Sequence, residues 1–273
     1  MLGNLQNNQL SKKGKLLMGK MIAIGNQKGG VGKTTTTVNL GAALASLGKK
    51  VLVIDSDSQG NATSGLGVER SDVKHSLYEV LVNNVPIEEA IMPTSDSNLF
   101  IVPSTIHLAA AELELMKLEN RENTLKNAVS SIRNQYDFIL VDCPPSLGQL
   151  SINAFTASNT ILIPVQAEYY ALEGLSQLLN TIRLVQRSYN RDFRIEGVLI
   201  TMLDARTNLG FEVVDEVRKY FQEKVYKSII PRNIRLSEAP SYGQSVIEYD
   251  PRSRGAEMYV ELAKEVIGND EEI

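Results

Sequence analysis

Short apolar runs alternate with longer amphipathic stretches along this chain. Six short runs are mostly apolar, as in buried strands of a parallel sheet: 21–25, 50–54, 99–102, 138–141, 160–165 and 197–201. Stretches between or after them carry apolar residues at helical spacing: 34–47, 106–118, 121–135, 170–189 and 209–224. This order predicts an α/β fold, a doubly wound and mostly parallel sheet flanked by helices on both faces.

The two ends of the chain are expected to lie outside this core. Residues 1–17, before a second methionine at Met18, are polar and predicted to form a flexible extension. A last amphipathic helix, 253–267, is expected to dock on the sheet, and 269–273 to form an acidic, disordered tail. Because no Pro, Gly or Ser linker is long enough to separate domains, 18–268 are predicted to form a single domain.

Composition narrows the class of protein. A formal net charge of -4 lacks the basic excess of a simple nucleic-acid coat, so any DNA binding has to come from a local patch. A single cysteine, Cys143, excludes an intramolecular disulfide, and with only His75 and His107 there is no zinc-type cluster. No apolar run approaches the ~20 residues that span a bilayer, so we expect a cytoplasmic protein without membrane insertion.

The segment NQKGGVGKTTTT, residues 26–37, lies between the first predicted strand and the first predicted helix. Backbone N–H groups of its glycines can face phosphate oxygens, Lys33 supplies a charge, and the Thr34 hydroxyl can reach Mg²⁺. The segment departs from the pattern GxxxxGK[ST] at Gln27, where a glycine is expected. It predicts a phosphate-binding loop, or P-loop, rather than a glycine-rich turn without a ligand. One lysine is enough for one phosphate site, so the second lysine of the segment, Lys28, needs a separate explanation.

Carboxylates follow two of the predicted strands. Asp142 ends the run FILVD, where it can organise the water shell of a metal bound at the loop. Asp55 and Asp57 end another strand, in VIDSDSQGN, and the carboxyl ends of parallel strands face the ligand crevice. One of the two can therefore orient or deprotonate an attacking water. For Asp55, capping a loop or supporting the metal's ligands is an equal alternative.

These motifs together resemble the ParA family of partition ATPases, most closely its Soj-type members. The matching stretches are NQKGGVGKTTTTVNLGAAL, VLVIDSDSQGNATSGLG, YDFILVDCPPSLGQLSINA, VQAEYYALEGLSQLLNTI, GVLITMLDARTNL and SIIPRNIRLSEAPS. They extend from Met18 to about Ile267, and their order makes the resemblance far more specific than a P-loop alone. It implies a P-loop fold with the deviant Walker A motif of this family.

The resemblance implies a magnesium-dependent ATPase that serves chromosome or plasmid partitioning. Such proteins form a nucleotide-sandwich homodimer with ATP, bind double-stranded DNA without sequence preference as that dimer, and hydrolyse ATP when a ParB-type partner and DNA stimulate them. We therefore expect a cytoplasmic, nucleoid-associated protein with weak intrinsic turnover.

The family's site residues map onto matching positions of this chain. The expected ATP contacts are Lys28, Gly29, Gly30, Val31, Gly32, Lys33, Thr34 and Thr35, with Pro231 and Asn233 bordering the adenine. The expected catalytic residues are Lys28, which crosses to the partner's phosphates, Lys33, and the water-activating Asp57. The expected metal site is Thr34, Asp57 and Asp142. Around Asp57 the family often has DLDPQGN, where this chain has DSDSQGN.

Arginines are frequent in the C-terminal third: Arg183, Arg187, Arg191, Arg194, Arg206, Arg218, Arg232, Arg235, Arg252 and Arg254. Arginine pairs well with phosphate, and binding without sequence preference needs only contacts to the DNA backbone. Arg206 and Arg235 align with positions that the Soj group uses for DNA, and each other arginine is better interpreted as part of a solvated helix face.

Four other functions are alternatives. A MinD-like membrane ATPase needs a basic amphipathic terminal helix, whereas this chain ends GNDEEI. A nitrogenase-iron-protein-like reductase supplies two cluster cysteines per subunit, and this chain has one. An ATP-dependent metabolic ligase needs a small-molecule pocket that the sequence does not reveal. A nucleotide switch without turnover would not need Asp57.

Overall fold

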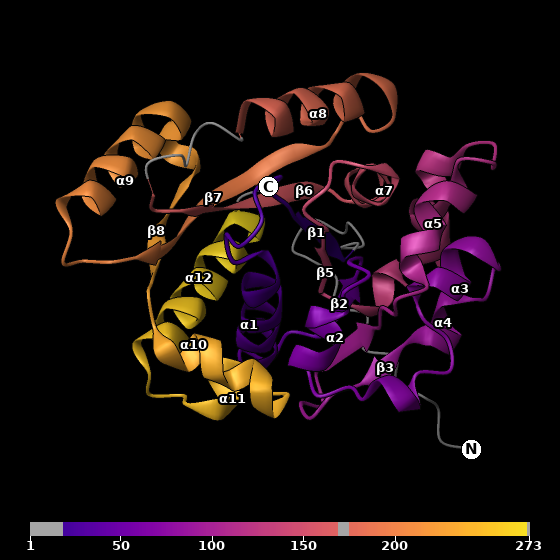
Figure 1. The fold of residues 1–273 in the computed structure, drawn as a ribbon, viewed down its shortest axis with the longest axis horizontal. Helices are drawn as coiled ribbons and strands as arrows, with labels where there is room; N and C mark the ends of the chain where they lie inside the picture. Colours follow the sequence, from indigo (N-terminus) through magenta and orange to yellow (C-terminus); the bar gives the residue numbers. More distant parts are fainter. Residues whose placement is uncertain (1–18, 169–174, 272–273) are drawn as a thin grey trace, which may run out of the picture.

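A computed structural model describes residues 19–168 and 175–271 (Figure 1). An eight-stranded sheet crosses the molecule in the order β3-β4-β2-β5-β1-β6-β7-β8. The strands are β1 (Lys20–Ile24), β2 (Val51–Asp55), β3 (Met92–Pro93), β4 (Leu99–Val102), β5 (Phe138–Asp142), β6 (Thr160–Gln166), β7 (Arg194–Leu203) and β8 (Val225–Pro231). Every neighbouring pair is parallel except β3 and β4. The predicted doubly wound, mostly parallel sheet is confirmed.

Helices cover both faces of the sheet. They are α1 (Lys33–Ser46), α2 (Asn61–Gly65), α3 (Leu77–Val82), α4 (Ile87–Ala90), α5 (Leu108–Leu115), α6 (Thr124–Ala128), α7 (Gln149–Ala157), α8 (Leu175–Ser188), α9 (Asn208–Phe221), α10 (Ile234–Glu238), α11 (Val246–Tyr249) and α12 (Arg254–Glu271). Helices α1 and α12 pack together on one face, and α7 and α8 lie on the other (Figure 1). Alternate residues of β1 enter different apolar cores: Met21 and Ala23 on one side, Ile22 and Ile24 on the other. This alternation fixes β1 in the middle of the sheet.

The six predicted strands are all present, and two strands were missed. Strand β8 lies at the edge of the sheet, and its buried residues, such as Tyr226 and Ile230, alternate with more exposed ones. Lys227 and Ser228 interrupt its apolar run, so it lacks the pattern of a doubly buried strand. The other missed strand, β3, has only two residues.

The prediction of one helix over 121–135 is wrong. The chain forms α6 and then two short 3₁₀ turns, Val129–Ser131 and Arg133–Gln135. The Ser130 hydroxyl donates to the carbonyl of Asn127 at 2.7 Å. Such side-chain bonds to the backbone compete with helical hydrogen bonding and weaken a continuous helix.

The last helix runs beyond its predicted end at Ile267. Gly268, the next residue, does not have the left-handed backbone with which glycine often ends a helix. Helix α12 therefore includes the first three residues of the expected tail and ends at Glu271. The predicted extension 1–17, and the first residues of the helix predicted from 170, lie outside the described residues.

Within the described part of the chain, no helix is both long and apolar enough to cross a membrane. The longest, α12, instead packs one side against α1 and β8.

A buried ion pair ties β1 to β7 across the intervening β6. The Lys20 ammonium lies 3.0 Å from the Glu196 carboxylate, and the two side chains are only 7% and 3% exposed. Asp270, in the last turn of α12, lies 3.6 Å from the same ammonium. The cluster thereby anchors the end of α12 to the sheet.

Removing Glu196 should leave the buried Lys20 ammonium with only the more distant and more exposed Asp270 as a partner. We expect Glu196→Ala to lower the free energy of unfolding by about 3–5 kcal/mol, measured by urea denaturation. The exposed pair of Lys264 with Glu261 is the matched control, since Glu261→Ala should change it by less than ~1 kcal/mol. Equal losses in the two variants would contradict the role given to burial.

Candidate active site

The glycine-rich loop joins β1 to α1 at the carboxyl edge of the sheet. Gly30 and Gly32 adopt left-handed backbone angles, with φ of +73° and +87°. Residues with a side chain rarely adopt such backbone angles, so both positions favour glycine. A Cβ on Gly29 or Gly30 would meet no atom within 4 Å, so the loop opens onto free space. The backbone at this opening can receive an anion.

Neighbouring strands hold the loop in place. Asn26 donates to the carbonyl of Pro164 in β6 at 2.7 Å and accepts from the backbone N–H of Lys28. The Thr201 hydroxyl of β7 donates to the carbonyl of Val31 at 2.9 Å. The Val31 side chain is buried, so this predicted ATP contact also anchors the loop.

Lys33 begins α1 and is nearly buried. Its ammonium donates to the carbonyl of Lys28 at 3.0 Å, so it lies inside the curve of its own loop. Burial lowers the pKa of Lys33, and the negative charge of Asp142 opposes this shift. An anion at the mouth of the loop would compensate the ammonium further.

Asp142, at the end of β5, is fully buried and bonded to α1. Its two carboxylate oxygens accept from the hydroxyls of Thr34 at 2.7 Å and Thr37 at 3.0 Å. The structure thus brings Thr34 and Asp142 together, as the metal-site prediction requires. Thr37 was missed by the sequence analysis, although its place three residues after Thr34 puts both hydroxyls on one helix face.

Asp55 lies beside Asp142, because the two are register partners on β2 and β5. It is fully buried and accepts from the backbone N–H of Thr63 at 2.8 Å and the Thr63 hydroxyl at 2.7 Å. Of the two alternatives left open for Asp55, capping the following loop therefore describes it. Burial raises the pKa of both carboxyls, and the negative charge of Asp55 raises the pKa of Asp142 further.

This donor set suits Mg²⁺. Carboxylate and hydroxyl oxygens are hard ligands, and a divalent cation would relieve the repulsion between the buried carboxyls. Thr34 and Asp142 are the side chains that would hold such a cation or the water around it, beside the opening of the loop.

Asp57 stands two residues beyond β2 and is only partly buried. Its backbone N–H donates to Asp55, and its own carboxylate accepts from the N–H of Gln59 at 3.0 Å. Its negative charge acts on both Lys33 and Asp142. Asp57 is therefore an accessible carboxylate beside the phosphate loop.

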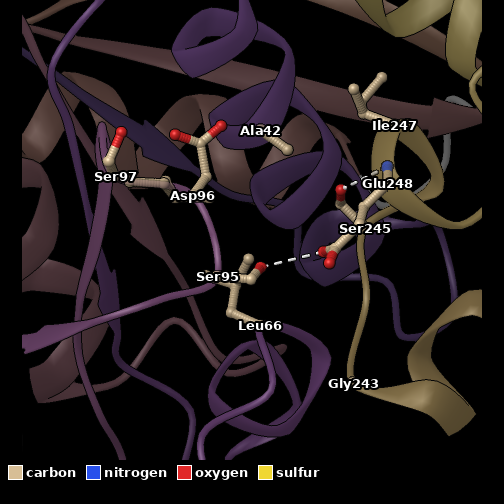
Figure 2. Close-up of a pocket in the computed structure, with 10 residues that line it drawn as sticks. Ala42, Leu66, Ser95, Asp96, Ser97, Gly243, Ser245, Ile247 and Glu248 are labelled. Atoms are coloured by element: carbon tan, nitrogen blue, oxygen red, sulfur yellow. Dashed lines mark hydrogen bonds between the residues drawn. The ribbon is translucent and has the colours of Figure 1, made fainter.

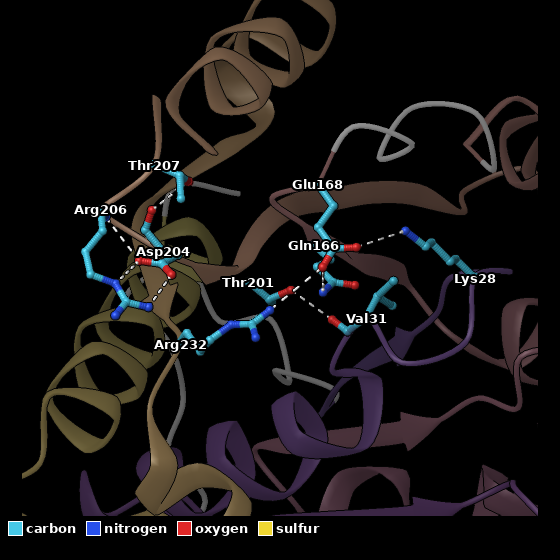
Figure 3. A network of polar contacts seen from close by, with 9 residues as sticks. All are labelled: Lys28, Val31, Gln166, Glu168, Thr201, Asp204, Arg206, Thr207 and Arg232. Atoms are coloured by element: carbon cyan, nitrogen blue, oxygen red, sulfur yellow. Dashed lines mark hydrogen bonds and ion pairs between the residues drawn. The ribbon is translucent and has the colours of Figure 1, made fainter. Parts of the chain in front are cut away.

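The second lysine of the loop, Lys28, points elsewhere. Its ammonium lies 3.9 Å from the carboxylate of Glu168, which also lies 3.8 Å from the guanidinium of Arg232 and accepts from Gln166 (Figure 3). The Lys28 side chain is 34% exposed, whereas Lys33 is 7% exposed. The two lysines therefore have different environments.

Pro231 and Asn233 lie where β8 leads into α10. Pro231 ends the strand as a register partner of Leu203. The Asn233 side chain accepts from the backbone N–H of Arg235 at 2.8 Å and so caps α10. Through Arg232, between them, this segment is linked to Glu168 and thus to Lys28.

Three predicted residues remain. Thr35 lies in the first turn of α1, where its carbonyl accepts from the side chain of Asn39. Arg206 follows β7, and Arg235 lies in α10, each with an exposed guanidinium.

A separate cavity of about 450 Å³ lies between α1, the loop before β4, and the segment that leads into α11 (Figure 2). Ala42, Asp96 and Ser245 are among its lining residues, and none belongs to the phosphate loop. At its wall the Ser95 hydroxyl donates to Glu248 at 3.0 Å. This contact joins the loop before β4 to α11. Because its lining residues lie outside the phosphate loop, the cavity is distinct from the candidate active site.

Comparison with known proteins agrees with this geometry. The model of the AAA domain family matches residues 19–195. The chain is 63% identical to the sporulation initiation inhibitor protein Soj of Bacillus subtilis, over 92% of this chain and 100% of that protein. It is 49% identical to the chromosome partitioning protein ParA of Myxococcus xanthus, over 95% and 92%. A structure of cobyrinic acid a,c-diamide synthase from Mycobacterium smegmatis with ADP and magnesium has a TM-score of 0.82 at 35% identity, covering 93% of this chain and 96% of that one.

The hydroxyl of Thr37 should be needed to satisfy the buried Asp142. We expect Thr37→Val, which keeps the shape but removes the donor, to lower the free energy of unfolding by about 1–3 kcal/mol in urea without nucleotide. Thr37→Ser keeps the hydroxyl, so it should lower the free energy of unfolding by less than Thr37→Val does. If the serine variant is the less stable of the two, packing rather than the hydrogen bond holds this contact.

Proposed function

The chain belongs to the ParA and Soj family of chromosome-partitioning ATPases, and we propose that it pairs with a second copy around ATP, binds DNA as that pair, and hydrolyses ATP when a ParB-type partner and DNA stimulate it. The similarity to Soj covers the whole of that protein at 63% identity. The similarity to the diamide synthase is lower, at 35% identity, so it favours a shared fold more than a shared ligase reaction.

ATP and magnesium are the cofactors of this ATPase. The backbone around Gly30 and Gly32 would surround the phosphates, and the Lys33 ammonium would neutralise part of their charge. Mg²⁺, when bound, spreads the charge that develops on the phosphate oxygens. Thr34 and Asp142, which are hydrogen-bonded to each other, would hold this ion or the water around it.

Asp57 is the proposed water-activating residue. A general base has to be accessible to water, and Asp57 is only partly buried, whereas Asp55 is fully buried and engaged with Thr63. The bond from the Asp57 N–H to Asp55 fixes the direction of the loop. Asp55 thus positions the base.

The placement of Lys28 carries the proposal of a shared active site. Its side chain extends out of its own loop towards Glu168 rather than into the opening where phosphate would bind (Figure 3). An exposed ion pair at 3.9 Å contributes little to stability, so a partner's phosphates can replace Glu168. Lys28 is therefore suited to report the nucleotide of a second subunit.

DNA binding is proposed for Arg206 and Arg235. Both guanidinium groups are accessible, and backbone contacts suffice for binding without sequence preference. Two copies of a weak patch in one dimer bind one duplex far more tightly than one copy does.

Replacement of the two lysines should produce different defects. We expect Lys33→Ala to weaken ATP binding by about 10- to 100-fold, because a charged hydrogen-bond donor to phosphate is lost. Lys28→Ala should keep ATP binding within about threefold and lose the ATP-dependent dimer. Fluorescent-nucleotide titration and analytical ultracentrifugation measure the two properties, and identical defects would remove the distinction between the lysines.

Stimulated turnover tests the function as a whole. We expect the ATPase rate to rise only modestly with DNA or with a ParB N-terminal peptide alone, and strongly with both. Asp57→Ala should bind ATP but lower the stimulated rate by about 10²- to 10⁴-fold, as expected for loss of a general base. Absence of stimulation by the pair would exclude the partitioning mechanism, and full turnover in Asp57→Ala would exclude the assigned base.

A further inference from the structure

The two arginines proposed to bind DNA are already bound by carboxylates of the same chain. Arg206 donates from Nε to Asp204 Oδ1 at 2.8 Å and from Nη2 to Asp204 Oδ2 at 2.6 Å (Figure 3). This is the two-pronged geometry in which guanidinium binds carboxylate or phosphate most strongly. The same contact holds the pKa of Asp204 well below its usual range, so the carboxylate is charged at neutral pH.

Arg235 is paired twice. It donates from Nη1 to Glu238 Oε2 at 2.8 Å, and its Nε lies 3.3 Å from Asp250 Oδ2. Glu238 lies one turn further along α10, and Asp250 directly follows α11. The Arg235 guanidinium is therefore neutralised from two elements, although 47% of the side chain is exposed.

Phosphate competes with these carboxylates for the same donors. A guanidinium that already makes two short bonds to a carboxylate has to give up or share them before it can bind a phosphate in the same way. The displaced carboxylate would then face the negative DNA backbone without its partner. Each pair therefore lowers the free energy gained from a phosphate contact.

We propose that Asp204, Glu238 and Asp250 set the DNA affinity of this protein by competing with DNA phosphates for Arg206 and Arg235. The inference rests on the proposed DNA binding and adds the groups that limit it. A single subunit then binds DNA weakly, and stable binding needs the doubled patch of a dimer.

The exchange has a measurable consequence for salt dependence. When an arginine moves from carboxylate to phosphate, the DNA releases a condensed cation, while the freed carboxylate attracts one from solution. The two effects partly cancel, so the parent protein shows a smaller salt slope than its number of phosphate contacts implies. In a variant that lacks the carboxylate, only the release of cations from the DNA contributes, so the salt slope is steeper.

The test uses the full-length chain with ATP and a short DNA duplex of arbitrary sequence, titrated at several salt concentrations. We expect Asp204→Asn to bind the duplex about three- to tenfold more tightly, and with a steeper salt slope. The asparagine keeps the oxygen that accepts the Arg206 backbone N–H at 3.1 Å, so the turn is preserved. Glu238→Gln together with Asp250→Asn should act likewise at Arg235.

A matched control separates competition from a general change in charge. Asp215 is exposed on α9 and makes no ion pair with any residue in 19–168 or 175–271. Asp215→Asn removes the same charge and should change affinity by less than twofold, because charges at the surface are screened by salt. Thermal unfolding by circular dichroism checks that each variant is folded.

The gain from Asp204→Asn should also depend on Arg206. In an Arg206→Ala background it should vanish; a gain that persists there, or one matched by Asp215→Asn, overturns the proposal. If Arg206→Ala and Arg235→Ala weaken DNA binding while the carboxylate variants equal the parent, competition is wrong and DNA binding stands. If the arginine variants bind DNA like the parent, the assigned DNA patch fails as well.

Discussion

The hydrogen bonds of the buried Asp142 are the contact on which the candidate active site depends. They join the end of β5 to the first turns of α1 through Thr34 and Thr37, and so fix the phosphate loop relative to the sheet. An unpaired carboxylate at this depth would be costly. The two hydroxyls satisfy both of its oxygens, and a cation bound beside them would compensate its charge. The stability of the helix start and the proposed affinity for metal would therefore be coupled.

The neighbouring Asp55 extends this constraint to the loop that carries Asp57. Its bonds to Thr63 close the loop after β2, and its register with Asp142 places both carboxyls at one edge of the sheet. Parallel strands bring their carboxyl ends together by geometry alone, so residues distant in sequence meet without a dedicated contact. The catalytic candidate itself is left accessible, as its chemistry requires.

The sheet, the P-loop and the pairing of Thr34 with Asp142 followed from the sequence, since continuous apolar runs and the glycine–lysine spacing leave few alternatives. Edge strand β8 and the broken helix around Ser130 did not, because burial and side-chain bonds to the backbone outweigh local periodicity there. Nor did the role of Thr37 as a support, or the carboxylate partners of Lys28, Arg206 and Arg235, and for Asp55 the sequence left loop capping as one of two equal alternatives. Each depends on a contact that sequence spacing does not specify.

Those partners follow one physical rule. The groups proposed to meet the phosphates of a second subunit or of DNA each lie against a carboxylate: Lys28 against Glu168, Arg206 against Asp204, and Arg235 against Glu238 and Asp250. All are exposed enough for solvent to keep the pairs weak, so a polyanion can replace the carboxylate. The buried pair of Lys20 and Glu196 is the contrast, because loss of either partner leaves a charge away from water. Burial thus separates the ion pairs that hold the fold from those that ligands can exchange.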